Sequence, residues 1–102
     1  MLILKSPIEF EWDEGNLAKT QRHGVSKTEV EQAYLDKRKN LLFDEKHSFS
    51  EKRYILIGRN KKSRWIYTVM TLRGGKVRVF SARYMHKEEV KLYEKATKAT
   101  KI

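Results

Sequence analysis

Arginine, glutamate and histidine side chains occur in this chain in a combination that could break an RNA phosphodiester bond without a metal ion. Such cleavage needs a base for the ribose 2′-hydroxyl, cations that stabilise the crowded phosphate, and an acid for the departing 5′-oxygen. Arginine suits the phosphate because its planar guanidinium binds two oxygens at once. The first candidates for phosphate binding are Arg53, Arg64, Arg78 and Arg83, and solvated strand charge is the alternative for each.

Arg83 has the most informative spacing of these. It follows Ser81 by two residues and alternates with Val77 and Val79, so the pattern predicts a cation on an otherwise apolar sheet face. A cation in that position needs an anionic partner. The partner is either a bound phosphate or a structural carboxylate from the first half of the chain, such as Glu51 or Asp13.

Two histidines are candidate proton carriers, because an imidazole changes protonation near neutral pH. They are His23 and His47, and a surface or capping role is the alternative for both. Trp12 and Trp65 could stack on bases, but in so small a domain we expect them to pack in the core.

The basic residues are concentrated in the second half of the chain. Residues 52–102 hold fifteen of the 23 Lys and Arg but three of the 13 Asp and Glu, a formal charge of +12, whereas residues 1–51 carry −2. Such an excess attracts a polyanion such as RNA or DNA, or an acidic partner.

Length and composition restrict the remaining possibilities. The 102 residues suit one domain spanning 1–102. The chain has no cysteine and three scattered histidines, so we expect no metal cofactor. Its apolar runs are far shorter than the roughly 20 residues of a membrane helix, and its opening residues do not resemble a secretory signal, so we expect a cytoplasmic protein with no membrane partner.

The first half predicts one strand and two helices. Residues 8–12 alternate as a short strand, and residues 13–23 predict a helix that Gly24 ends. Ser26 and Glu29 form a capping-box pattern that opens a second helix, whose apolar stripe includes Val30, Ala33 and Tyr34.

The second half predicts most of the sheet. Residues 41–43 read as a strand, 44–50 as a loop, 53–59, 64–73 and 76–84 as an antiparallel meander, and 86–100 as a lysine-rich helix. The expected fold is therefore α+β, an antiparallel sheet of four to five strands flanked by helices.

Gly74 and Gly75 predict a two-residue hairpin, because both central positions of a type I′ turn need positive φ. The implied register pairs Arg73 with Lys76, Thr71 with Arg78, Thr68 with Ser81, and Ile66 with Arg83. It places Arg73, Lys76 and Arg78 at the turn end of one face, and Arg64, Thr68, Ser81 and Arg83 on the other.

Several ordered blocks resemble the BrnT family of toxins from bacterial type II toxin–antitoxin systems. The blocks are Phe10 to Asn16, Arg22 to Ser26, Asp44 to Ser48, Glu51 to Tyr54, Ile57-Gly58 and Arg78 to Arg83, and the resemblance covers nearly all of residues 8–95. It implies a fold similar to the RelE-like ribonucleases and an RNA-cleaving activity that blocks translation. It also implies a BrnA-type antitoxin whose ribbon-helix-helix region binds operator DNA, and it marks His23, Glu51, Arg53 and Arg83 as positions that matter for activity.

The working hypothesis is a metal-independent ribonuclease toxin. Arg53 and Arg83 stabilise the scissile phosphate, and His23 or Glu51 assists proton transfer. Further RNA contacts are expected from Lys19, His47, Arg64, Arg73, Lys76 and Arg78. The alternative is a non-catalytic module whose basic half binds nucleic acid or an acidic partner.

Overall fold

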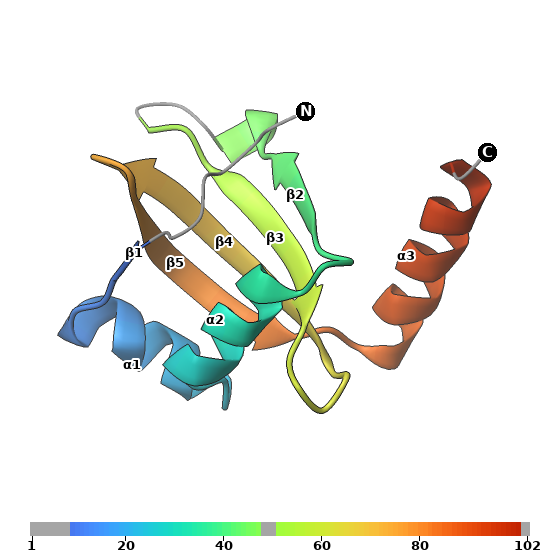
Figure 1. Ribbon diagram of the computed structural model, residues 1–102, viewed down its shortest axis with the longest axis horizontal. Helices are drawn as coiled ribbons and strands as arrows, with labels where there is room; N and C mark the ends of the chain where they lie inside the picture. The colour runs from blue at the N-terminus through green and yellow to red at the C-terminus, as the bar shows by residue number, and fades with distance from the viewer. Residues whose placement is uncertain (1–8, 48–50, 101–102) are drawn as a thin grey trace.

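The computed structural model describes residues 9–47 and 51–100, which form a five-stranded sheet with three α-helices and a short 3₁₀ helix, η1 (Figure 1). The strands are β1 (Glu9–Glu11), β2 (Asn40–Phe43), β3 (Tyr54–Arg59), β4 (Trp65–Arg73) and β5 (Lys76–Tyr84). The helices are α1 (Glu14–Arg22), α2 (Lys27–Leu35), η1 (Glu45–His47) and α3 (Lys87–Thr100). The α+β prediction is confirmed.

The sheet has the strand order β1-β5-β4-β3-β2. The pairs β2–β3, β3–β4 and β4–β5 are antiparallel, as predicted, and β3-β4-β5 is the expected meander. Strand β1 pairs with β5 in parallel, so the sheet is mixed. The parallel pair is possible because the rest of the domain connects these two strands.

Both early helices begin directly after a capping residue, and the cap of the second was predicted. Asp13 is the N-cap of α1 and exchanges hydrogen bonds with Asn16, while Ser26 and Glu29 form the predicted capping box of α2. Helix α1 ends at Arg22 with His23 as its C-cap, and Gly24 follows with a φ of 79°, a left-handed value that favours glycine.

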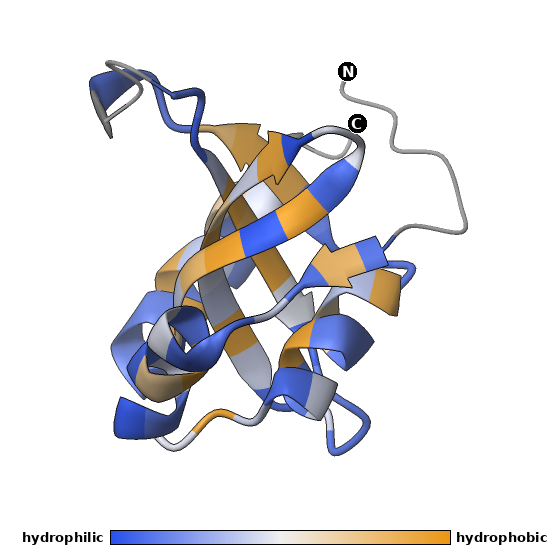
Figure 2. Ribbon diagram, turned by 90° about the vertical axis from the view of Figure 1, so that its left-hand side faces the viewer, coloured by the Kyte–Doolittle hydropathy of each residue, from blue (hydrophilic) through white to orange (hydrophobic). Residues whose placement is uncertain are grey.

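The hydrophobic core lies between α1, α2 and one face of the sheet, which we call the core face. Figure 2 shows hydrophobic and hydrophilic residues alternating along the strands, as expected when one face is buried. Helix α2 packs so closely on β3 that a Cβ at Gly58 would overlap the backbone of Ala33. The buried core residues are Val25, Val30, Ala33, Tyr34, Leu56, Ile66, Met70, Val77, Val79 and Ala82.

The β4–β5 hairpin follows the predicted register only near its turn. Gly74 and Gly75 have φ values of 54° and 80°, and Arg73 pairs with Lys76 as predicted. Beyond Met70 and Val79 the register shifts by one residue, because Val69 pairs with Ser81 and leaves Phe80 as an extra residue in β5.

This β-bulge makes the predicted pairs of Thr68 with Ser81 and Ile66 with Arg83 wrong. Thr68 pairs with Ala82, and Ile66 pairs with Tyr84. A one-residue shift moves every later side chain to the other face. Arg83 therefore does not share a face with Val77 and Val79. With Ser81 and Arg78, it lies on the face turned away from α1 and α2, which we call the open face.

Candidate functional site

The open face carries a group of charged side chains at the end nearest the β4–β5 turn. We call it the turn-end cluster, and its members are Glu11, Asp13, Glu51, Arg53, Arg73 and Arg78. Three different segments supply it: β1 with the start of α1, the residues just before β3, and the β4–β5 hairpin. Side chains of opposite charge that lie far apart in the sequence are thereby brought together.

Glu51 and Arg73 form the most direct contact in the cluster. The Arg73 Nε and Nη2 atoms donate to the two Glu51 carboxylate oxygens at 2.5 and 3.1 Å. This hydrogen-bonded pair lowers the pKa of Glu51 below its usual value, and the charges of Arg73, Arg53 and Arg78 lower it further. Glu51 is therefore a carboxylate at neutral pH and faces three guanidinium groups.

Arg78 links β5 to the beginning of the domain. Its Nη1 lies 2.9 Å from Glu11 Oε1, and its Nη2 lies 2.7 Å from Asp13 Oδ2. The pKa of Asp13 is lowered first by the hydrogen bond from the Asn16 amide and next by Arg78. The side chain of Arg78 is 20% exposed, so part of the guanidinium remains accessible to an anion.

Arg53 lies over the extra residue of the bulge. Its guanidinium carbon is 4.5 Å from the centre of the Phe80 ring, a cation–π distance. The backbone just before Arg53 is held by Thr71, whose hydroxyl donates to the Lys52 carbonyl at 2.6 Å. The bulge thus supplies the aromatic surface that supports Arg53 within the cluster.

Arg83 lies at the opposite end of the open face, where α3 begins. Its Nη1 and Nη2 donate to the Glu89 carboxylate at 2.7 and 2.9 Å, and its guanidinium lies 4.6 Å from the centre of the Tyr67 ring. The Arg83 bonds and the His86 amide lower the pKa of Glu89 to about 2. The carboxylate partner of Arg83 is therefore Glu89, and neither Glu51 nor Asp13 fills that role.

The structure does not bring all four predicted catalytic residues together. Glu51 and Arg53 belong to one cluster, but Arg83 is five residues from Arg78 along β5, about 16 Å at the usual strand rise. His23 is exposed at the end of α1, ten residues from Asp13, or about 15 Å along a helix. By these separations along the backbone, His23 and Arg83 lie apart from the turn-end cluster.

The residues predicted to contact RNA also lie in different regions of the structure. Arg73, Arg78 and Lys76 lie at the turn end, where Lys76 is 3.6 Å from Glu9. Lys19 is exposed in the last turn of α1, and Arg64 lies 3.6 Å from the centre of the Tyr84 ring, at the other end of β5. The side chain of His47 falls outside the described part of the chain.

Both tryptophans are partly buried and have protein partners. Trp12 donates to Glu31 at 2.8 Å and stacks on Phe10, while Trp65 packs edge-on against Tyr93 of α3 at 5.2 Å. Trp12 packs beside the core, as expected for it, and Trp65 packs between the sheet and α3.

Within residues 9–47 and 51–100, no three His, Asp or Glu side chains gather as ligands for a metal ion. None of the described helices is long and apolar enough to cross a membrane.

Residues 12–89 match the sequence model of a family described as the ribonuclease toxin, BrnT, of type II toxin–antitoxin systems. The chain belongs to the BrnT family. The match covers well over half of the 102 residues and includes every member of the turn-end cluster except Glu11. No curated protein matches the chain. BrnT membership confirms the predicted toxin class and implies an antitoxin as partner.

Sequence reasoning named four members of the turn-end cluster as site residues, Glu51, Arg53, Arg73 and Arg78, but not as one group. It missed Glu11 as a member, and it considered Asp13 only as a partner of Arg83. The alternation of Glu11 and Asp13 around the predicted first strand was the available signal, but only the parallel pairing of β1 with β5 places them beside Arg78.

Proposed function

We propose that this BrnT-family protein is a metal-independent endoribonuclease whose turn-end cluster is the catalytic site. The observation that carries the proposal is the ionised Glu51 carboxylate on the open face of the sheet, which binds Arg73 directly and is within electrostatic reach of Arg53 and Arg78. A base beside several phosphate-binding cations is the minimum that RNA cleavage through the 2′-hydroxyl requires.

The proposed reaction assigns one role to each group. Glu51 takes the proton from the ribose 2′-hydroxyl, whose oxygen attacks the adjacent phosphorus. Arg73, Arg53 and Arg78 stabilise the additional negative charge on the phosphate oxygens. The bond to the 5′-oxygen breaks, and Lys76 at the same end of the sheet carries a proton that it can give to that oxygen. The products are a 2′,3′-cyclic phosphate and a 5′-hydroxyl.

Membership of the BrnT family supports a biological setting, which is part of the proposal. As a type II toxin, the protein acts on RNA in the cytoplasm and thereby inhibits translation, and a BrnA-type antitoxin neutralises it. A ribbon-helix-helix region in that antitoxin carries the complex to operator DNA.

The test compares the two ends of the open face in one assay. Purified wild-type protein, Arg78→Ala and Arg83→Ala are incubated with a labelled single-stranded RNA in the presence of EDTA. We expect wild-type cleavage to survive EDTA, Arg78→Ala to lose about 100-fold in rate, and Arg83→Ala to lose much less.

Two results would change the proposal in different ways. A large loss in Arg83→Ala with little loss in Arg78→Ala would move the phosphate site to Arg83, as the sequence hypothesis has it. Salt-sensitive RNA binding by the wild-type protein without cleavage would favour the non-catalytic binding module.

A further inference from the structure

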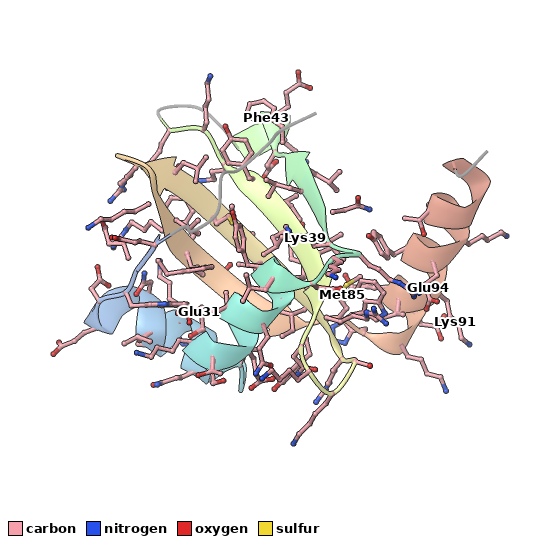
Figure 3. The ribbon with its side chains drawn as sticks, viewed as in Figure 1. Glu31, Lys39, Phe43, Met85, Lys91 and Glu94 are labelled. Carbon is pink, nitrogen blue, oxygen red and sulfur yellow. The ribbon has the colours of Figure 1, made fainter. Side chains whose placement is uncertain are left out.

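A second basic region lies at the far end of the open face, between α3 and the segment that joins α2 to β2. It is a groove of about 430 Å³, which we call the α3 groove. Lys37, Arg38 and Lys39 form one wall, and Tyr93 of α3 forms the other, with Asn40 and Trp65 between them. Figure 3 labels Lys39 beside the start of β2 and Glu94 on α3.

The walls of the groove are held in place by direct contacts. The Asn40 amide donates to the Tyr93 hydroxyl at 2.6 Å, and the rings of Trp65 and Tyr93 pack edge to face at 5.2 Å. Arg59 lies 5.3 Å from the centre of the Trp65 ring and pairs with Asp36. The aromatic side chains are therefore oriented before any ligand arrives.

The positive charge of the groove is not neutralised as it is at the turn end. Each of Arg73 and Arg78 has a carboxylate partner, whereas no ion pair among the described residues includes Lys37 or Arg38. Lys39 lies over the Tyr34 ring at 5.1 Å, and Glu94 is the acidic residue in the lining. Three cations against one carboxylate leave a net attraction for an anion.

The position of the groove relative to the turn-end cluster points to the ligand. Trp65 begins β4 and Arg73 ends it, so the two regions lie at opposite ends of one strand of nine residues, roughly 27 Å apart at the usual rise. Cations beside aromatic rings are typical of sites that hold single-stranded nucleic acid through its backbone and bases. A strand of RNA cleaved at one end of the sheet would therefore reach the other.

We propose that the α3 groove is a second RNA-binding site, which holds the backbone of a single-stranded substrate several nucleotides away from the scissile phosphate. The inference rests on the proposed function, because it extends the substrate of the turn-end cluster along the open face. It predicts that affinity depends on RNA length, since a short RNA cannot occupy both regions.

The experiment uses the full chain and two single-stranded RNAs of mixed sequence, 4 and 16 nucleotides long, with 2′-O-methyl groups that prevent cleavage. Lys37→Gln/Arg38→Gln should weaken binding of the 16-mer about tenfold, and should reduce the slope of log K against log salt by about 1.4. Binding of the 4-mer should not change. The matched control is Lys61→Gln/Lys62→Gln, which removes the same charge from the β3–β4 loop outside the groove.

Three outcomes would overturn the inference. The first is unchanged 16-mer binding by Lys37→Gln/Arg38→Gln, and the second is an equal loss in the control. The third is loss of antitoxin binding with RNA binding intact, which would make the groove a protein interface. Because 2′-O-methyl RNA reports binding alone, the result is separate from that of the cleavage assay, in which an inactive wild-type protein would refute the proposed function.

Discussion

In the turn-end cluster, an RNA phosphate must compete with carboxylates for the arginine side chains. Arg73 is bound by Glu51, and Arg78 is bound by Glu11 and Asp13. Exposed ion pairs of this kind contribute little to stability because water screens them. We infer that the acidic partners orient the guanidinium groups and that an RNA phosphate can displace them.

Glu51→Gln tests the carboxylate as the base. A base acts only when ionised, and because the pKa of Glu51 is lowered from 4.5, the wild-type rate should be constant above about pH 5 and fall as pH drops below 4.5. Glu51→Gln should lose about 100-fold or more and show no acid limb. The measurement is kcat/KM against pH on a short RNA, and an acid limb that persists in Glu51→Gln would exclude this role.

Arg78→Lys tests whether the bidentate geometry of the guanidinium matters. A lysine keeps the charge but cannot contact Glu11 and Asp13 as Arg78 does while also presenting a fork to the phosphate. We expect kcat to fall about 10- to 100-fold. Arg22→Lys, at the exposed end of α1, is the matched control and should leave kcat unchanged. Full activity of Arg78→Lys would show that charge alone is sufficient.

Among the elements, the β5 bulge has the largest effect on the site. The sequence predicts the strands of the meander, and Gly74-Gly75 predicts the register as far as Val79. No turn residue or break in the pattern marks Phe80 as an extra residue, because its accommodation depends on packing across the sheet. The bulge moves Arg83 onto the open face, where Glu89 of α3 reaches it.

Helix α3 should detach from the sheet at low pH. The pKa of Glu89 is lowered to about 2, so its pair with Arg83 contributes fully above pH 4.5, and that contribution is lost as the pH falls toward 2. Trp65, which packs on Tyr93 of α3, reports the loss by fluorescence in a Trp12→Phe background.

Glu89→Gln is the control for this transition. It should already show weakened α3 packing at pH 7, and its Trp65 emission should change little between pH 4.5 and 2. Circular dichroism on the same samples separates detachment from global unfolding. Identical pH curves for the two proteins would show that the Arg83–Glu89 pair does not hold the helix.

Gly58→Ala should destabilise the contact between α2 and β3. The added methyl group would overlap the Ala33 backbone, which cannot move as a flexible side chain would. We expect a loss of about 1–3 kcal/mol in the free energy of unfolding, measured with urea. Ala18→Ser, which adds one atom to an exposed position of α1, should change stability by less than about 0.5 kcal/mol. Equal stability of the two variants would contradict the close packing.

Across the whole molecule, the charge imbalance of the sequence is redistributed by the fold. Carboxylates of the first half meet arginines of the second half at the turn end, as in the pair of Glu51 with Arg73. The sequence therefore predicts which residue types form the candidate site, but not which cations have a carboxylate partner: Arg73 and Arg78 of the basic half are paired, whereas Lys37 and Arg38 of the acidic half are in no ion pair among the described residues. Contacts between segments far apart in the chain decide which charged residues are paired, and local sequence patterns do not encode those contacts.

The central claim is that the 2′-hydroxyl of RNA is the attacking group at a metal-independent site. The most direct measurement is the cleavage rate, in EDTA, of an RNA with a mapped cleavage site and of the same RNA with one 2′-deoxynucleotide at the scissile position. We predict cleavage of the first to a 2′,3′-cyclic phosphate and no cleavage of the second at that position. Equal cleavage of both, or an intact all-ribose RNA, would contradict the mechanism.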